Sequence, residues 1–407
     1  MGGECLWNGC VPSKALIAAA RAAHHARHAR RFGVEVGDVR VRLGEALDHL
    51  RAVQARIAPH DSPERFRGLG VDVHLGHARL VSPREVEVDG KRLRARNIVI
   101  ATGTRPAVPP IPGLADVPYL TNESVFDVTS LPGTLIVIGG GPIGVEMAQA
   151  FARLGSTVHV VEALPEFFSR EDRELAGLLQ AHLEAEGLTF HLGAAATAVR
   201  HANGVTSVDI TRADGHNTTL QGDALLVAVG RSPNLKDLGL EQVGVKTDRG
   251  GIVVDSYLRT SVPGVWAVGD VVSGGLKFTH VADHMARGLL RNALFPGKRR
   301  LDYSSVPWVT YTDPELAHVG LTETEARQRY GSRIGVWRRD VGAVDRVIAD
   351  GGPAGMVKIV TDAKGRVLGG HILGPHAGDM IGELTIALTQ GMTVADLGAV
   401  IHPYPTT

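Results

Sequence analysis

Cys5 and Cys10 are the residues of this sequence best suited to chemistry, because they are its only cysteines and lie close together. A framework of structural disulfides needs more cysteines, spread along the chain. Zinc sites usually pair cysteines two residues apart and add further Cys or His, whereas four residues separate Cys5 from Cys10 and no second pair exists. Two interpretations therefore stay open: a local redox-active disulfide, or two inert buried thiols.

A second chemical pattern is the glycine-rich run that follows the apolar segment LIVI. Gly139, Gly141 and Gly144 form G-x-G-x-x-G, which permits a tight turn, close approach of a pyrophosphate, and close packing of helix on strand. Glu162 ends the next apolar segment. A carboxylate there would accept hydrogen bonds from a ribose 2′-hydroxyl and repel a 2′-phosphate. The pattern predicts dinucleotide binding, with NADH preferred over NADPH.

The elements that must position these residues alternate between helix and strand signals. Residues 13–32 are rich in alanine and predict a helix that ends at Gly33. Residues 96–106 predict a short apolar strand that ends in a turn. Residues 133–163 predict a strand, a turn, a helix and a second strand, the arrangement that the glycine motif requires.

Three histidines in the first predicted helix raise the question of a metal site. His24 and His28 are four residues apart, with His25 beside them. Arginines line the same stretch, and no carboxylate joins the histidines. We therefore interpret this face as solvated and basic, and expect no metal there.

Composition excludes several classes of function. The chain has 407 residues, 44% of them hydrophobic, and 43 basic side chains balance 43 acidic ones. Such a balance predicts no attraction to nucleic acid or to an anionic membrane. No apolar run is long enough to span a bilayer. The first residues have no signal-peptide pattern, so the expected location is the cytoplasm.

Five motifs follow one another along the chain: GGECLWNGCVPSK at the start, ATG at 101–103, GGGPIGVE at 139–146, AVGRSPN at 228–234 and VWAVGD at 265–270. In this order they resemble the flavin-dependent pyridine nucleotide–disulfide oxidoreductases, a family that includes dihydrolipoamide dehydrogenase, glutathione reductase and mercuric reductase. The resemblance covers essentially the whole chain and favours the mercuric-reductase-like and dihydrolipoamide-dehydrogenase-like branches. VPWVTYTDPELAHVG (306–320) and GGHILGPHAGDMI (369–381) look like parts of the family's dimerisation domain.

The resemblance implies how the two cysteines work. Electrons would pass from NADH to FAD and then to a disulfide between Cys5 and Cys10. Cys10 would be the thiolate beside the flavin, and Cys5 the outer thiol that exchanges with substrate. A thiolate at a helix start near Lys14 would have a lowered pKa. Lys14 and Glu146 correspond to an ion pair near the flavin ring.

The resemblance also assigns the remaining cofactor contacts. The flavin side chain would bind Asp270, and the adenine would meet the backbone of Ala78. The implied contacts for both cofactors are Lys14, Ala78, Thr102, Gly103 and Asp270 for FAD, and Gly139, Gly141, Gly144, Glu162 and Gly230 for the nicotinamide nucleotide.

Two departures from the family pattern concern the cofactors. Relatives carry a βαβ unit with its own G-x-G-x-x-G before the cysteine motif, and this sequence opens directly on the cysteines. We therefore expect the chain as written to lack the FAD pyrophosphate site, to bind little flavin and to be poorly soluble. Pro142 also replaces the aromatic residue that covers the flavin in glutathione reductase.

A third departure concerns the acid–base residue that family members donate across the dimer. Aligning the final Pro-Thr of IHPYPTT with the family motif places Tyr404 where the catalytic histidine is expected. His402 lies two residues earlier, and the glutamate that pairs with the histidine would fall after Thr407. A phenol is a poor proton shuttle near pH 7, but a soft metal ion needs thiolates more than protons.

The sequence therefore predicts an α/β protein with two Rossmann-like nucleotide-binding domains, the first truncated, and an α+β dimerisation domain. We expect a homodimer that uses FAD and NADH to reduce an acceptor through Cys5 and Cys10, with no nucleic-acid or membrane partner. The favoured acceptor is a metal ion, as in mercuric reductase. The alternatives are dihydrolipoamide dehydrogenase, with His402 as base, and an NADH-binding fragment without turnover. The expected segments are 1–132 for FAD, 133–252 for NAD, 253–304 as a central segment and 305–407 for dimerisation.

Overall fold

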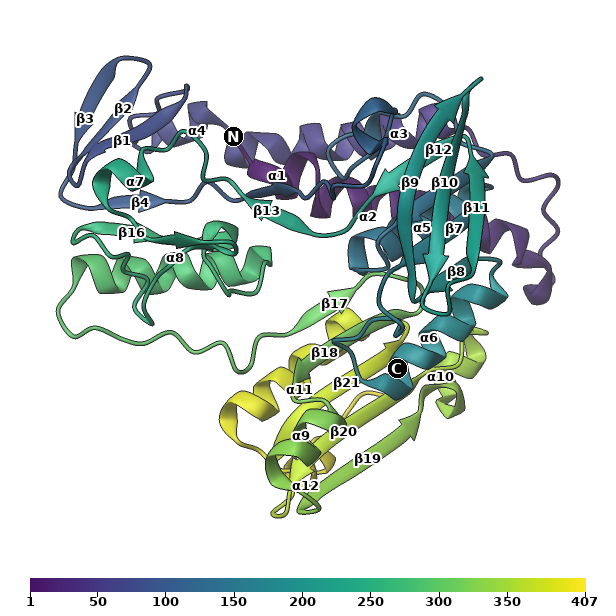
Figure 1. The fold of residues 1–407 in the computed structure, drawn as a ribbon. Coiled ribbons are helices and arrows are strands. Elements are labelled where there is room, and N and C mark those ends of the chain that lie inside the picture. Colours follow the sequence, from purple (N-terminus) through teal and green to yellow (C-terminus); the bar gives the residue numbers. More distant parts are fainter. The chain divides into compact units, whose positions relative to one another are not determined.

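The computed structural model describes residues 1–407, which form two compact units built from interleaved segments (Figure 1). Each unit has its own set of packed helices and strands. The first unit comprises Met1–Cys5, Ile57–Ala107 and Gly230–Tyr303, and the second comprises Leu6–Arg56, Val108–Val229 and Ser304–Thr407.

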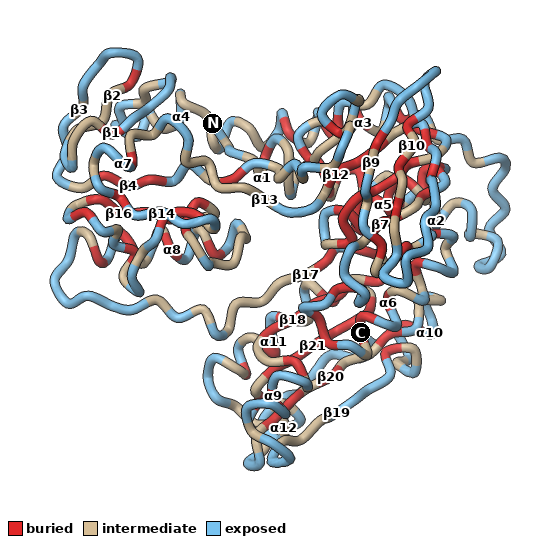
Figure 2. The backbone as a smooth tube through the Cα atoms, viewed as in Figure 1, coloured by how far each residue is buried: buried red, intermediate tan, exposed pale blue.

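The second unit contains a four-stranded parallel sheet in the order β12-β6-β7-β8. Helix α5 packs on β6 and β7, and α2 packs on α5 (Figure 1). The buried core lies between these helices and the sheet, and Figure 2 shows buried residues along α5 and β7. The elements are α2 (Cys10–Arg27), α3 (Leu43–Ile57), β6 (Thr134–Ile138), α5 (Pro142–Leu154), β7 (Thr157–Glu162), α6 (Arg173–Ala185), β8 (Thr189–Leu192) and β12 (Ala224–Val227).

Two antiparallel sheets complete the second unit. One has the order β11-β10-β9, and the other has the order β17-β18-β21-β20-β19. Helix α11 covers β18 and β21 of the larger sheet. Their elements are β9 (Ala194–Ala202), β10 (Val205–Arg212), β11 (Asn217–Gly222), β17 (Trp308–Thr310), β18 (Glu315–Gly320), α9 (Glu323–Tyr330), β19 (Ile334–Asp340), α10 (Asp345–Ala349), β20 (Met356–Asp362), β21 (Val367–Gly374), α11 (Ala377–Gln390) and α12 (Val394–Gly398).

The first unit is built from short strands. Strands β1, β2 and β3 form an antiparallel sheet, β4 pairs in parallel with β16, and β5 pairs antiparallel with β13. Its elements are α4 (Pro63–Gly68), β1 (Ala78–Ser82), β2 (Glu85–Val88), β3 (Lys91–Arg94), β4 (Ile98–Ile100), β5 (Thr104–Pro106), β13 (Arg231–Pro233), α7 (Leu240–Val243), β14 (Thr247–Asp248), β15 (Gly251–Ile252), β16 (Val265–Ala267) and α8 (Thr279–Leu294).

The first predicted helix differs at both ends from the prediction. Helix α2 begins three residues earlier, at Cys10, because the first turn of a helix tolerates a proline such as Pro12. The α-helix ends at Arg27, and a 3₁₀ turn (Ala29–Phe32) follows. Gly33, in the left-handed conformation at φ 75°, closes that turn.

The predicted strand over residues 96–106 was also wrong in part, because the structure divides it into two strands. The first part, β4, pairs with β16, and the second part, β5, pairs with a different strand, β13. Residues 101–103 lie between them without strand pairing. The prediction of strand, turn, helix and strand over residues 133–163 is confirmed by β6, α5 and β7.

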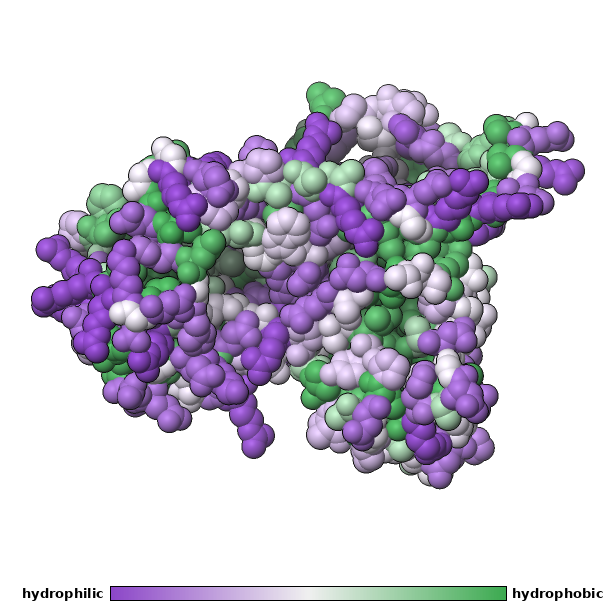
Figure 3. Space-filling view, turned by 90° about the horizontal axis from the view of Figure 1, so that it is seen from above, coloured by the Kyte–Doolittle hydropathy of each residue, from purple (hydrophilic) through white to green (hydrophobic).

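No helix of the structure has the length and apolar character needed to cross a lipid bilayer. Hydrophilic side chains cover much of the face shown in Figure 3, and hydrophobic ones gather in patches between them.

Candidate functional site

The two cysteines lie in consecutive helices, Cys5 inside the first and Cys10 at the start of the second. Cys5 is in the short helix α1 (Gly3–Trp7) and is partly exposed, whereas Cys10 is the exposed first residue of α2. The N–H of Ser13 donates to the Gly9 carbonyl at 3.1 Å, which closes the first turn of α2. The Cys10 side chain therefore lies at the positive end of an 18-residue helix, where a thiolate is stabilised.

Lys14 follows Cys10 by one helical turn and pairs with a carboxylate of α5. Its Nζ lies 2.8 Å from Oε2 of Glu146. Glu146 is only 6% exposed, and its other oxygen, Oε1, accepts the backbone N–H of Tyr311 at 2.8 Å. Both carboxylate oxygens thus have donors, which compensates the cost of burying the charge. The ion pair suggested by the resemblance is present in the structure, and its place beside a flavin remains a prediction.

The glycine-rich turn has the geometry that each glycine was expected to supply. Gly139 has φ 110°, and a Cβ at Gly144 would overlap the Gly139 carbonyl oxygen, so helix and strand touch there. A Cβ at Gly141 would meet nothing within 4 Å, which leaves its surface open at the start of α5. The turn therefore fits a pyrophosphate at a helix N-terminus.

Glu162 is held at the end of β7 by two backbone donors. Oε2 accepts the N–H of Gly140 at 2.8 Å, and Oε1 accepts the N–H of Leu164 at 2.8 Å. Each carboxylate oxygen has a further lone pair that could accept from a ribose hydroxyl. The contact of this carboxylate with a ribose remains a prediction.

The predicted flavin contacts of the first unit lie around the ATG segment. Thr102 Oγ1 donates to the Asn234 carbonyl at 2.9 Å, and Asn234 Nδ2 donates back to the Thr102 carbonyl at 3.0 Å. Gly103 has φ 64° and open space where a Cβ would stand, so a ring could approach the backbone. Asp270 accepts from Thr104 Oγ1 at 3.3 Å and keeps acceptor capacity for a hydroxyl chain. These residues fit the flavin end of FAD.

Two predicted nucleotide contacts are less constrained. Ala78 is the exposed first residue of β1, where it pairs with Val88. Gly230 has φ 121°, and its carbonyl accepts the N–H of Ala107 at 2.9 Å. Lys14, Glu146, Glu162 and the glycine turn belong to the second unit, whereas Ala78 and Gly230 belong to the first.

The sequence analysis missed Arg231, which organises the first unit beside Cys5. Its guanidinium pairs with the carboxylate of Glu4, the residue before Cys5. Its Nε donates to Thr104 Oγ1 at 2.6 Å, and Asp270 lies 3.8 Å away. Arg231 stands in the AVGRSPN motif, but no local signal in the sequence indicates its pairing with Glu4.

His402 and Tyr404, near the C-terminus, each have a hydrogen-bond partner that the sequence did not predict. His402 Nε2 lies 2.9 Å from Glu383 Oε1, and this hydrogen bond raises the pKa of His402. Helix α11 supplies Glu383, a partner that the sequence motifs did not indicate. Tyr404 is 81% exposed, and its hydroxyl donates to Asp345 at 2.8 Å, which raises the pKa of the phenol.

The histidines of α2 are not uniformly solvated, which corrects the prediction of a solvated basic face. His25 and His28 are exposed, but His24 is half-buried. Burial, followed by the charge of Arg153, lowers the pKa of His24 to about 4. His24 is therefore neutral at pH 7, and only the exposed part of this face is basic.

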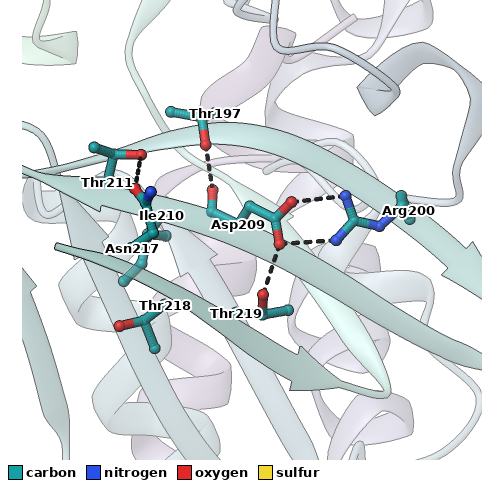
Figure 4. Close-up of a pocket in the computed structure, with 8 residues that line it drawn as sticks. All are labelled: Thr197, Arg200, Asp209, Ile210, Thr211, Asn217, Thr218 and Thr219. Carbon is teal, nitrogen blue, oxygen red and sulfur yellow. Dashed lines mark hydrogen bonds and ion pairs between the residues drawn. The ribbon is translucent and has the colours of Figure 1, made fainter. Parts of the chain in front are cut away.

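A pocket of about 400 Å³ lies on the antiparallel sheet of β9, β10 and β11 (Figure 4). Its charged side chains satisfy each other: Arg200 bonds Asp209 with two nitrogens, and Thr219 Oγ1 donates to the same carboxylate at 2.8 Å. The pocket contains none of the predicted site residues, so we do not place the chemistry there. Its lining residues are Thr197, Arg200, Asp209, Ile210, Thr211, Asn217, Thr218 and Thr219.

Comparison with known proteins identifies the family. Residues 1–286 match the pyridine nucleotide-disulphide oxidoreductases, and residues 306–407 match the dimerisation domain of the same family. The chain belongs to this family of flavin-dependent oxidoreductases, which use a pyridine nucleotide. The dimerisation domain supports a homodimer.

The relatives include enzymes named for two different substrates. The chain is 40% identical over 420 residues to dihydrolipoyl dehydrogenase from Thermus scotoductus, covering all of this chain and 87% of that protein. It is 36% identical over 416 residues to mercuric reductase from Streptomyces lividans, covering 100% and 86%. The HOCl-induced flavoprotein disulfide reductase RclA from Escherichia coli has a similar structure, with a TM-score of 0.88 at 31% identity, covering 100% and 89%. A Cu(II) complex of RclA matches equally well, with a TM-score of 0.88 at 30% identity.

Proposed function

We propose that this enzyme uses NADH to reduce a thiophilic metal ion through Cys5 and Cys10. The observation that carries the proposal is the state of Tyr404, which stands at the expected base position. The hydrogen bond that its phenol donates to Asp345 raises the pKa of the phenol, so the phenol stays protonated near pH 7 and cannot accept a proton there. Reduction of a thiophilic ion needs thiolates and places little demand on such a base.

NADH supplies all the electrons that the proposed reaction of the cysteine pair needs. Reduction of the Cys5–Cys10 disulfide breaks the S–S bond and takes up two electrons and two protons. Transfer of the electron pair to a divalent metal ion yields the zero-valent metal, re-forms the S–S bond and releases both protons. Flavin, when bound, would carry the electron pair from the nicotinamide to the cysteines.

The residues of this chain would hold charge during these steps. Lys14 would stabilise negative charge near Cys10, and Glu146 would hold Lys14 in place. Gly139, Gly141 and Gly144 would seat the pyrophosphate of the nicotinamide nucleotide. Glu162 would bind the ribose and disfavour NADPH, which makes NADH the proposed reductant.

A second candidate activity is dihydrolipoamide oxidation, favoured by a specific contact. The His402–Glu383 pair holds an imidazole and a carboxylate 2.9 Å apart, an arrangement suited to general acid–base catalysis of thiol–disulfide exchange. The similarity to dihydrolipoyl dehydrogenase supports the same candidate.

The test compares acceptors and variants of the FAD-loaded enzyme. We expect NADH oxidation driven by Hg(II), lost in Cys5→Ser, while flavin reduction by NADH persists in that variant. Full Hg(II) turnover by Cys5→Ser would show that the cysteine pair is not the route. Strong dihydrolipoamide activity that His402→Gln abolishes, with little Hg(II) reduction, would instead establish the second candidate.

A further inference from the structure

The ammonium group of Lys14 has two partners, the ring of Tyr311 and the carboxylate of Glu146. Lys14 Nζ lies 4.4 Å from the centroid of the Tyr311 ring and 2.8 Å from Glu146 Oε2. The backbone N–H of Tyr311 donates to Glu146 Oε1 at 2.8 Å. One residue thus contacts both members of the ion pair, with its ring on the cation and its backbone on the anion.

The three residues come from distant parts of the chain within the second unit. Lys14 is in the first turns of α2, Glu146 is in α5, and Tyr311 directly follows β17. Their meeting is therefore a product of tertiary packing. Tyr311 also lies in VPWVTYTDPELAHVG, a motif so far connected only with dimerisation.

Without these two contacts, the Lys14 side chain would populate several rotamers. Its four-carbon stem is flexible, and the Lys14 side chain is 37% exposed. The buried Glu146 anchors the ammonium from one side, and the ring face attracts it from another. Because Lys14 is four residues after Cys10, both side chains lie on the same face of α2. The position of the ammonium therefore controls the field that a Cys10 thiolate experiences.

We propose that Tyr311 is a positioning residue that holds Lys14 against Glu146 and so maintains the charge that stabilises the Cys10 thiolate. The inference rests on the proposed redox role of Cys10. Burial and the charges of Glu315, Glu146 and Cys10 raise the pKa of the Tyr311 phenol. The phenol therefore stays neutral at pH 7, and its ring keeps its attraction for a cation.

The test uses a protein with one thiol, which makes the readout specific. In the FAD-loaded Cys5→Ser variant, Cys10 is the only cysteine. The rate of iodoacetamide alkylation is measured against pH, and its midpoint gives the thiol pKa even if access to Cys10 is limited. Tyr311→Leu, Tyr311→Phe and a control, Tyr330→Leu, are compared in this background; Tyr330 also lies near a cation, Arg329.

We expect Tyr311→Leu to move the midpoint upward and to lower the alkylation rate below the midpoint about two- to five-fold, the value of one exposed cation–π contact. Tyr311→Phe keeps the ring and should behave like Tyr311, as should Tyr330→Leu. An unchanged profile in Tyr311→Leu would overturn the proposal. A shift in Tyr311→Phe as large as in Tyr311→Leu would also overturn it, because the hydroxyl would then be the active group.

A second comparison separates positioning from a general loss of structure. When Lys14→Met has removed the cation, adding Tyr311→Leu should cause no further shift of the midpoint. An additional shift of the same size would show that the ring acts without Lys14, and would overturn the proposal. These thiol measurements need no acceptor, so they stand even if Hg(II) turnover by Cys5→Ser refutes the proposed function.

Discussion

At the scale of single residues, the position of Glu162 gives the sharpest expectation about cofactor choice. Two backbone N–H groups hold its carboxylate at the end of β7, next to the glycine turn. A side chain held in this way cannot easily swing aside for a phosphate group. The charge of Glu162 should therefore act directly on the ribose end of the nucleotide.

We predict that kcat/KM is at least about tenfold higher with NADH than with NADPH, because a 2′-phosphate would lie against a fixed carboxylate. Glu162→Gln should raise kcat/KM with NADPH and so bring the ratio of the NADH value to the NADPH value closer to one. Glu166→Gln removes a more exposed carboxylate of the following loop and should leave the ratio unchanged. Equal kcat/KM values for the two cofactors in the wild-type enzyme would mean that Glu162 does not contact the ribose.

At the scale of elements, a buried lysine joins the start of α6 to strand β20. Lys358 is 3% exposed, and its Nζ lies within 3.0 Å of Asp172, Glu174 and Glu323. Asp172 also caps α6 by accepting the N–H of Glu174 at 3.1 Å. Burial opposes ionisation of Glu323, but hydrogen bonds from Lys358 and Arg327 outweigh it and lower its pKa to about 2.

The lowered pKa of Glu323 predicts how stability depends on pH. A carboxylate whose pKa falls on folding contributes stability above its unfolded pKa of 4.5 and loses it as the pH falls toward about 2. Lys358→Met should reduce this dependence and lower the free energy of unfolding at pH 7 by about 3 kcal/mol, since Asp172 loses its cation while Glu174 and Glu323 keep only their arginine partners.

Chemical denaturation at several pH values between 4.5 and 2 measures both effects. Lys364→Met removes the same charge from an exposed turn and serves as the control. A slope of stability against pH that is the same in Lys358→Met and in wild type would contradict the assignment.

At the scale of the whole molecule, the dimerisation domain leaves apolar side chains on its surface. Ile386 projects from α11 with 62% of its surface exposed, and Ile348 on α10 is equally exposed. Because the dimerisation domain supplies the contact between two copies, we expect Ile386 to lie in that contact.

We predict that Ile386→Asp weakens the homodimer, because a charge would replace an apolar contact in the interface. Analytical ultracentrifugation over a range of protein concentrations should show a monomer fraction that the wild-type enzyme lacks. Leu290→Asp, at a 55% exposed position of α8 in the other unit, should leave the dimer intact. If Ile386→Asp has the same dimer dissociation constant as the wild-type enzyme, Ile386 does not lie in the interface.

Patterns confined to short stretches were sufficient to predict several parts of this protein. The glycine turn and the strands around it depend on neighbouring residues, because a tight turn, a helix start and close helix–strand packing each demand glycine at a particular place. The start of α2 at Cys10 was not predicted in this way, because the alanine-rich pattern placed the start of the helix at Ser13. The family itself could be inferred because its motifs keep their order along the chain.

The tertiary structure alone decided which distant residues meet. Arg231 pairs with Glu4, Glu383 pairs with His402, and Tyr311 covers Lys14, each across a long stretch of chain or from a separate element. The division of residues 96–106 into two strands likewise depended on two different partner strands. Such contacts depend on how whole elements pack together. The side-chain periodicity of one segment shows which face is buried, but it does not show which residues will contact that face.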